Sequence, residues 1–366
     1  MRVRVDRLVR TFPGTPGKHV LDGLELELPG PGVHAVIGAN GSGKTTLLRA
    51  LALLDPPDGG AILFDEACVA HGGCRRPARG ARRRTAMVFD RPALLRGTVR
   101  WNLEFALGAA GVAHGEGEAR IASLTEPLAL AKILDARVDR ISAGEARRAA
   151  LARGLSLRPE LLLLDEPTAN LDPLSAAVVE RAVAGLAERR EATVVLATHD
   201  LGQARRMADD VHFLTAGRIG QGGGAAEVLD APQSVALAEF VGMENVFLGA
   251  VEDRGDHQRF RAPGIDWAVV AEKTGPGWAG LPARDVLVSR EPVSSSAMNA
   301  VRGTIVAVAE RGPTVLITIG VRADAADVAV RLTAAVTRAT LQGMGLAAGQ
   351  DVWFVFKASS VRLFDG

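Results

Sequence analysis

The segment GANGSGKT, from Gly38 to Thr45, combines the residue types that bind phosphate groups. Glycines let a loop wind so tightly that successive backbone N–H groups face phosphate oxygens, and the beginning of a helix adds partial positive charge. The Lys44 side chain can reach the terminal phosphates of a nucleotide, and the Thr45 hydroxyl can ligate Mg²⁺. A buried-strand pattern precedes the segment and a helical pattern follows it, which is the context that this phosphate-binding motif requires. The candidate nucleotide-binding residues are Gly38, Asn40, Gly41, Ser42, Gly43, Lys44, Thr45 and Thr46.

A second candidate site lies in LLLLDEP, residues 161–167, where an apolar run ends in two adjacent carboxylates. Successive residues at a strand end point in opposite directions, so the two carboxylates need not share one role. Asp165 is placed to hold Mg²⁺ through its water shell, and Glu166 can polarise an attacking water as a general base. An isolated Asp-Glu pair is more often a solvated loop, but its position behind four leucines and the accompanying phosphate loop favour a catalytic site.

The elements that must position these residues follow from the hydrophobic pattern. Short, mostly apolar runs are typical of parallel strands covered on both faces, and helical patterns alternate with them. The strands are predicted at 33–37, 161–165 and 193–198, and the helices at 44–54, 144–155 and 176–190. This alternation predicts an α/β domain with a parallel sheet. Residues from about 90 to 155 are mainly helical in pattern, which predicts an inserted helical subdomain.

Three further segments make the pattern specific. ISAGEARRAALARGL (141–155) resembles the signature motif of ABC-transporter ATPases, usually written LSGGQ. ANLD (169–172) and ATHD (197–200) are similar to the loop after the Walker B strand and to the switch-histidine loop of that family. The resemblance covers about residues 1–235, for which it implies the α/β P-loop ABC ATPase fold with ATP and Mg²⁺ as cofactors.

The resemblance also implies a head-to-tail homodimer in which two ATP molecules lie between the subunits. Ser142 and Gly144 of one subunit would then cap the γ-phosphate bound by the other, with Glu145 completing the signature and Asp172 in the dimer loop. A Ser hydroxyl and a backbone N–H at a helix N-terminus form an anion site, which makes this arrangement physically sensible. One chain carries two half-sites, so a monomer is expected to be inactive.

Two ring side chains take roles from the same resemblance. His199 would contact the γ-phosphate and help Glu166 hold the attacking water, whereas a lone histidine is otherwise a common surface residue. Phe12 matches the aromatic side chain that stacks on adenine, and simple core packing explains it nearly as well.

The chain departs from the family pattern at three positions. Ala143 replaces the first glycine of the signature, Glu145 replaces its glutamine, and Asp90 stands where the family has the Q-loop glutamine. In the family, that amide ligates Mg²⁺, meets the attacking water and relays motion to the membrane partner. Aspartate keeps an oxygen but loses the N–H₂ donor and adds negative charge beside Glu166. We expect Asp90 to ligate Mg²⁺ and to make hydrolysis slower and more dependent on Mg²⁺ than glutamine would.

The last third of the chain has a different hydrophobic pattern. Short alternating runs divided by Gly, Pro and Asp predict an all-β, OB-like region, with a linker at 236–246, a first β segment at 247–295 and a second domain at 296–366. The last of these resembles the mop or TOBE module of some importer ATPases, which binds or senses a tetrahedral oxyanion such as molybdate. The matching candidates for oxyanion contact are Ser296, Asn299, Lys357 and Ser359. Met298 stands where the family often has Arg, and a purely structural, dimerising β-module is an equal alternative.

Together the two halves resemble the ATP-binding subunit of a molybdate- or tungstate-type ABC importer. Residues 89–103 would form the groove for a membrane permease, with Leu94, Leu95 and Trp101 as apolar contacts, and a binding protein outside the cell would act indirectly. The chain would lie at the cytoplasmic face of the cell membrane. Two alternatives stay open: an ATP-binding regulator with little hydrolysis, and an importer ATPase for sulfate, a sugar or a polyamine.

The composition sets limits on these functions. The 366 residues suggest two or three domains, and no stretch approaches the ~18 uninterrupted apolar residues of a membrane-spanning helix. A net charge of +1 gives no overall field that selects nucleic acid, so no nucleic-acid partner is expected. Two cysteines in a chain of this length exclude a disulfide scaffold and fit a reducing compartment.

Overall fold

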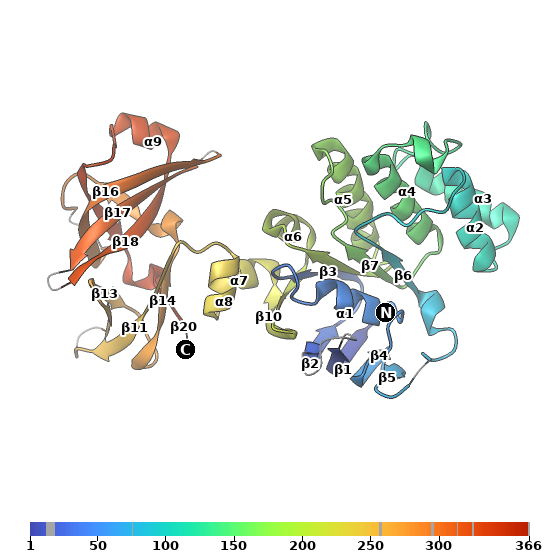
Figure 1. Ribbon diagram of the computed structural model, residues 1–366, viewed down its shortest axis with the longest axis horizontal. Helices are drawn as coiled ribbons and strands as arrows, with labels where there is room; N and C mark the ends of the chain where they lie inside the picture. The colour runs from blue at the N-terminus through green and yellow to red at the C-terminus, as the bar shows by residue number, and fades with distance from the viewer. Residues whose placement is uncertain are drawn as a thin grey trace. The chain divides into compact units, whose positions relative to one another are not determined.

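The computed structural model describes residues 1–11, 19–74, 76–255, 258–293, 296–312, 314–323 and 326–364, so that Phe12 lies outside the described residues. The chain divides into two compact units, Met1–Asp230 and Ala231–Gly366, and each is described by itself (Figure 1). The predicted end of the first domain, residue 235, lies near this division. Residues predicted as a linker, 236–246, include most of helix α8 (Val235–Phe240) and the first residues of β11 (Asn245–Asp253).

The first unit is built around a six-stranded sheet in the order β10-β9-β3-β8-β7-β6. Five strands run parallel, and β10 is antiparallel to its neighbour β9. The strands are β3 (Gly32–Ile37), β6 (Thr85–Val88), β7 (Leu161–Asp165), β8 (Thr193–Thr198), β9 (Asp210–Thr215) and β10 (Arg218–Gly224). Every residue of β3, β7 and β8 is buried, because both faces of the sheet are covered. The predicted α/β fold with a parallel sheet is confirmed.

The two faces of this sheet belong to different hydrophobic clusters. Helix α1 (Lys44–Leu51) packs against β7 and β8 on one face, in a cluster with a four-stranded antiparallel sheet. That sheet has the order β2-β1-β4-β5, with β1 (Val3–Thr11), β2 (His19–Leu28), β4 (Gly59–Phe64) and β5 (Ala67–His71). Helix α5 (Pro173–Glu188) packs against the other face, on β3 and β8. Two shorter helices, α6 (Leu201–Met207) and α7 (Ala225–Asp230), and the 3₁₀ turn η1 (Ala81–Arg84) complete this layer structure.

The segment predicted as a helical subdomain contains α2 (Val99–Ala109), α3 (His114–Thr125), the 3₁₀ turn η2 (Val138–Arg140) and α4 (Ala143–Ser156). The three α-helices pack against one another, and α4 also packs against β6 (Figure 1). The fully buried Asn102 ties α2 to the preceding loop, because its amide donates to the Leu95 and Thr98 carbonyls and its oxygen accepts from Leu95 N–H. These hydrogen bonds hold the end of the loop between β6 and α2 against the helix.

The second unit consists of two five-stranded antiparallel sheets around one shared hydrophobic core. The first sheet has the order β13-β12-β11-β14-β20, and the second β15-β19-β16-β17-β18. The further strands are β12 (Gln258–Ala262), β13 (Ile265–Val269), β14 (Gly275–Leu281), β15 (Leu287–Ser289), β16 (Asn299–Arg311), β17 (Thr314–Ala323), β18 (Ala326–Thr337), β19 (Asp351–Phe356) and β20 (Arg362–Phe364). Helix α9 (Arg338–Gly343) and the 3₁₀ turns η3 (Ala283–Asp285) and η4 (Ala358–Ser360) connect them.

The two predicted β segments, 247–295 and 296–366, interleave in this unit. Strand β20, from the end of the chain, pairs with β14, and β15 pairs with β19. The core is likewise shared, since the Trp267 ring meets the Phe356 ring edge to face with centroids 5.1 Å apart. The two segments therefore form one folding unit, and neither can complete its sheet alone.

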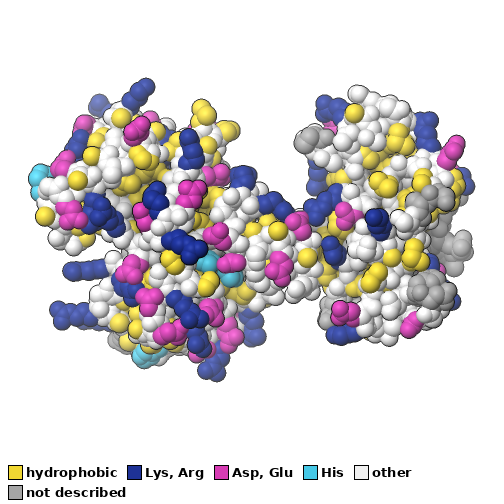
Figure 2. Space-filling model, turned by 180° about the vertical axis from the view of Figure 1, so that it is seen from behind, with side chains coloured by type: hydrophobic (Ala, Val, Ile, Leu, Met, Phe, Trp, Pro, Cys, Tyr) yellow, Lys and Arg dark blue, Asp and Glu magenta, His cyan; other side chains and the backbone are white. Residues whose placement is uncertain are grey.

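Charged side chains of both signs are scattered over the visible face of the molecule (Figure 2). Figure 2 shows basic and acidic side chains interspersed over both units on the face in view. This distribution accords with the net charge of +1. Among the described residues, no helix is long and apolar enough to cross a bilayer.

A buried histidine in β9 makes stability depend on pH. His212 is 9% exposed, and burial, followed by the neighbouring His34, lowers its pKa from 6.5 to about 4, with Asp210 opposing the shift. As the pH falls, the unfolded chain therefore takes up this proton before the folded chain does. The contribution of neutral His212 to stability is fully present above pH 6.5 and is lost as the pH drops to about 4. We expect a loss of up to about 3 kcal/mol in unfolding free energy across this window.

Urea unfolding followed over this pH window measures the effect. His212→Gln is expected to reduce the slope by the contribution of one proton, while His19→Gln, at an exposed position in β2, leaves it unchanged. An unchanged slope in the His212→Gln protein would assign the pH dependence to other groups.

Candidate active site

The phosphate-binding loop connects β3 to α1 and depends on two glycines. Gly38 has φ +155°, and a Cβ there would lie 2.3 Å from the Leu214 carbonyl oxygen, so no larger residue fits. Gly43 has φ +110° and forms the N-cap of α1, with no side chain capping the first turn. The backbone N–H groups at the beginning of α1 are thus left for a ligand, as an anion site requires.

Lys44 is held inside this loop. The residue is only 7% exposed, and Nζ donates to the carbonyl oxygens of Gly38 at 2.7 Å and Ala39 at 3.1 Å. Burial lowers the pKa of Lys44, and the carboxylates of Glu166 and Asp165 oppose that shift. A partly desolvated ammonium at the beginning of a helix without a side-chain cap is well suited to bind phosphate oxygens.

Asp165, at the end of β7, faces the phosphate loop. The Thr45 hydroxyl donates to its two oxygens at 2.9 and 3.2 Å. Burial raises the pKa of Asp165, the Thr45 hydrogen bond opposes this, and the Glu166 and Asp90 carboxylates raise it further. A hydroxyl and a buried carboxylate with surplus negative charge around them are a donor set that fits Mg²⁺, whose charge offsets that of the carboxylates when it is bound. Thr45 and Asp165 would hold the ion.

Glu166 and His199 meet at the ends of the adjacent strands β7 and β8. Glu166 Oε1 accepts a hydrogen bond from His199 N–H at 3.1 Å and lies 2.7 Å from His199 Nδ1. The Thr198 hydroxyl lies 3.5 Å from Glu166 Oε2. The Glu166 side chain is mostly buried, whereas that of His199 is 58% exposed, so the histidine presents the open side of the pair. A carboxylate oriented by a histidine in this way can serve as a general base toward a water molecule.

The signature residues form the beginning of α4. Ser142 and Glu145 make a capping box, in which Glu145 N–H donates to Ser142 Oγ at 3.3 Å and Ser142 N–H donates to Glu145 Oε2 at 2.8 Å. Glutamate in place of glutamine therefore stabilises the helix start, where negative charge is favourable. Helices α4 and α5 lie so close together at this point that a Cβ at Gly144 would approach Ser175 Oγ to 2.9 Å.

The candidate dimer residues do not join the phosphate loop of their own chain. In the described residues, Ser142 and Glu145 bind each other, and Asp172 caps α5 by accepting from the N–H groups of Leu174 and Ser175, both at 3.0 Å. Leu174, next to this cap, is 81% exposed. The arrangement leaves the signature and the dimer loop on the surface, as a role toward a second subunit requires.

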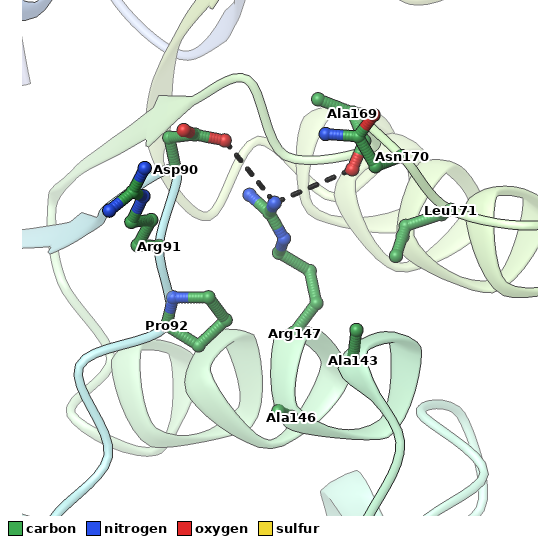
Figure 3. Close-up of a pocket in the computed structure, with 9 residues that line it drawn as sticks. All are labelled: Asp90, Arg91, Pro92, Ala143, Ala146, Arg147, Ala169, Asn170 and Leu171. Atoms are coloured by element: carbon green, nitrogen blue, oxygen red, sulfur yellow. Dashed lines mark hydrogen bonds and ion pairs between the residues drawn. The ribbon is translucent and has the colours of Figure 1, made fainter.

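The structure places Asp90 beside a residue that the sequence analysis missed. Asp90 Oδ1 lies 3.4 Å from Nη2 of Arg147, a buried arginine in α4 (Figure 3). Arg147 Nη1 also donates to the Glu166 carbonyl at 2.9 Å. The sequence offered only an arginine within the predicted helix 144–155, with nothing to indicate that it faces Asp90. Asp90 as a ligand of Mg²⁺ stays a prediction.

The oxyanion candidates gather at one end of the second sheet but differ in burial. Ser296 precedes β16, and Lys357 and Ser359 follow β19, its antiparallel neighbour; all three are exposed. Asn299 is buried, and both ends of its amide are used, since Oδ1 accepts from Ala268 N–H at 2.7 Å and Nδ2 donates to the Ala268 carbonyl at 2.9 Å. Its observed role is to bind β16 to β13.

An apolar patch lies on the helical subdomain. Leu95 is 40% exposed, and the rings of Trp101 and Phe105 on α2 contact each other with centroids 5.4 Å apart and are both exposed. Leu94 is half-buried and packs against the core beneath. Phe105, two residues beyond the predicted groove at 89–103, extends the patch.

The geometry defines a P-loop nucleotide hydrolase: a phosphate loop with a buried lysine, a Thr-Asp pair suited to Mg²⁺, and a Glu-His pair at adjacent strand ends. The ABC transporter family model matches residues 21–169, and the TOBE domain model matches residues 295–363. The chain belongs to the ABC transporter family and is an ATPase of that family.

Three relatives illustrate the range of its similarity. The phosphate import ATP-binding protein PstB 2 of Natronomonas pharaonis is 38% identical over 64% of this chain and 85% of the relative. The molybdate/tungstate import ATP-binding protein WtpC of Pyrococcus horikoshii is 30% identical over 91% of this chain and 92% of the relative. The Fe(3+) ions import ATP-binding protein FbpC 1 of Rhodococcus jostii is 35% identical over 89% of this chain and 88% of the relative.

A solved structure agrees with these matches. The structure of cbiO1 from Clostridium perfringens, described as part of an ABC transporter complex, superposes with a TM-score of 0.56 at 26% identity, covering 62% of this chain and 90% of that chain.

Proposed function

We propose that the chain is the ATP-hydrolysing subunit of an ABC importer for molybdate or tungstate. The observation that carries this proposal is the similarity to the molybdate/tungstate protein WtpC, which extends over 91% of this chain and therefore includes the second unit. The exposed Ser296, Lys357 and Ser359 at one end of β16 and β19 offer hydroxyl and ammonium donors of the kind that bind a tetrahedral oxyanion.

Within this function, each site residue has a chemical task. Lys44 and the N–H groups at the start of α1 bind the phosphates of ATP, and Thr45 and Asp165 hold Mg²⁺. Glu166, oriented by His199, accepts the proton of the attacking water. The contact between Glu166 and His199 supports hydrolysis over a purely regulatory use of ATP.

The same proposal assigns partners. Two copies of the chain enclose ATP, with Ser142 and Gly144 of one copy facing the phosphates bound by the other. The exposed Leu95, Trp101 and Phe105 provide an apolar face for a helix of a membrane permease. The chain thereby lies against the cytoplasmic face of the membrane, and an external binding protein delivers the solute to the permease.

Iron import is a second candidate, because the Fe(3+) import protein FbpC 1 covers nearly as much of the chain at 35% identity. Uptake measurements distinguish the two. In cells that lack the chain, accumulation of tungsten or molybdenum, measured by mass spectrometry, is expected to fall and to return with the wild-type chain but not with Glu166→Gln. A loss confined to iron would support the second candidate, and a loss of neither metal would contradict both.

Oxyanion binding by the second unit can be tested separately. Tungstate and molybdate at about 100 times their dissociation constant are expected to stabilise the folded chain by about 2.7 kcal/mol, measured as a rise in melting temperature, with sulfate as a comparison. Lys357→Met should remove the rise, and Lys273→Met, at another exposed lysine of the same unit, should not. The absence of any rise with the wild-type chain would leave the second unit as a structural module without contradicting oxyanion transport.

A further inference from the structure

The guanidinium of Arg147 joins three segments that lie far apart in the sequence. It is 6% exposed and makes contacts with the Glu166 carbonyl at 2.9 Å, the Asp90 carboxylate at 3.4 Å and the Ala169 carbonyl at 3.5 Å. Figure 3 shows the side chain extending from α4 between Asp90 and Ala169. Arg147 lines a pocket of about 360 Å³ at this point. Arg147 thus connects the loop after β6, the signature helix and the loop after β7.

The hydrogen bond from Arg147 to the Glu166 carbonyl is made to a residue with a strained backbone conformation. Glu166 has φ +47°, in the left-handed region that residues other than glycine occupy only at a cost. Its N–H donates to the Ala197 carbonyl at 2.9 Å, and its own carbonyl accepts from Ala169 N–H at 3.2 Å and from Arg147. The direction of the Glu166 carboxylate toward His199 depends on this backbone conformation, so the arginine helps to aim the general base.

The charges at positions 90 and 147 complement each other. A buried guanidinium that faced only carbonyl groups would lack a counter-charge, which is costly in a protein interior. An aspartate at 90 without Arg147 would add its negative charge to those of Asp165 and Glu166. In the ion pair, Asp90 supplies the counter-charge of the buried Arg147, and Arg147 offsets the negative charge that Asp90 adds. This ion pair accounts for an aspartate at position 90.

We propose that Arg147 is a positioning residue for ATP hydrolysis, which holds the backbone of Glu166 in its catalytic conformation and is itself oriented by Asp90. Asp90 then serves Arg147, in contrast to the expectation from the sequence that it ligates Mg²⁺. The proposal rests on the ATPase activity of the site and not on the transported solute, so a wrong solute assignment leaves it intact.

A double-mutant cycle on the purified full-length chain tests this role. Arg147→Gln is expected to lower kcat about 100-fold, as misplacement of a catalytic group does, while KM for ATP changes less than about threefold because the phosphate loop is not touched. The loss in Asp90→Gln/Arg147→Gln should be smaller than the product of the two single losses by about tenfold, because no buried charge is left unpaired. The exposed ion pair between Arg206 and Glu180 serves as control, and its glutamine variants should show no coupling.

Two further measurements separate positioning from ligation of Mg²⁺ and from a loss of folding. Amide hydrogen exchange of residues 166–172 in the nucleotide-free chain should become faster in Arg147→Gln and in Asp90→Asn, and the Mg²⁺ concentration for half-maximal turnover should stay within about twofold of wild type in Asp90→Asn. If Arg147→Gln does not fold, Asp90→Asn, at a half-exposed side chain, and Arg147→Lys carry the test. Unchanged exchange at 166–172, multiplicative losses, or a large rise in the Mg²⁺ requirement of Asp90→Asn would overturn the proposal.

Discussion

Replacing Glu166 by Gln is expected to lower ATP turnover about 1,000-fold while ATP binding is retained. The amide has the same shape as the carboxylate but cannot accept a proton from water, so the general base is lost. The phosphate loop, with Lys44 donating to the Gly38 carbonyl, does not depend on the charge of Glu166 and should bind ATP as before. ATP-bound dimers should therefore accumulate, because the two subunits no longer separate after hydrolysis.

Turnover of radiolabelled ATP and size-exclusion chromatography in the presence of ATP measure the two effects. Glu191→Gln is a suitable control, since this residue forms an exposed ion pair with Arg189. If the wild-type chain hydrolyses ATP no faster than Glu166→Gln, even with its permease present, the chain is a regulator that binds ATP and the role of Glu166 as base is wrong.

Replacing Lys44 by Met is expected to weaken ATP binding about 100-fold, equivalent to about 2.7 kcal/mol. Lys44 supplies the charge-assisted hydrogen bonds to phosphate, and each such bond contributes about 1.5–3 kcal/mol. The nucleotide-free protein should respond differently. Its buried ammonium has a pKa lowered by desolvation, and removal of this charge partly offsets the loss of hydrogen bonds to the Gly38 and Ala39 carbonyls.

The melting temperature without ATP should therefore change little in Lys44→Met, and the rise on addition of Mg-ATP should largely disappear. Calorimetric titration and thermal unfolding with and without nucleotide measure both quantities. Lys132→Met, at an exposed lysine of the helical subdomain, should behave as wild type. An ATP affinity within about threefold of wild type in Lys44→Met would show that the ammonium does not bind the phosphates.

Asp90 illustrates where sequence reasoning was incomplete. The departure from the family pattern was visible in the sequence, and so was the surplus negative charge that it brings. Its partner, Arg147, is 57 positions away on another element, and an arginine in a helix gives no indication of which carboxylate it faces. A residue whose role depends on a distant counter-charge needs the tertiary structure before it can be interpreted.

Asn299 shows the same limit in the second unit. As part of a motif it was a candidate for oxyanion contact, yet its amide is occupied by the backbone of Ala268. The order of the strands was equally hidden, because β20 pairs with β14 and closes the sheet of an earlier segment. Antiparallel pairing between distant segments depends on the packing of whole sheets and leaves little trace in any short stretch of sequence.

The phosphate loop, the acidic strand end, the parallel sheet and the family could all be predicted from the amino-acid sequence. These features are local: glycine at defined positions, an unbroken apolar run and the onset of a helix each follow from backbone geometry within about ten residues. Which side chains contact one another became clear only from the folded structure. Glu166 reaches His199 because β7 and β8 are neighbours in the sheet, and Arg147 reaches Asp90 and Glu166 because α4 packs beside β6. Such contacts are set by strand order and helix packing, which arise from the burial of the whole hydrophobic core and not from any one motif.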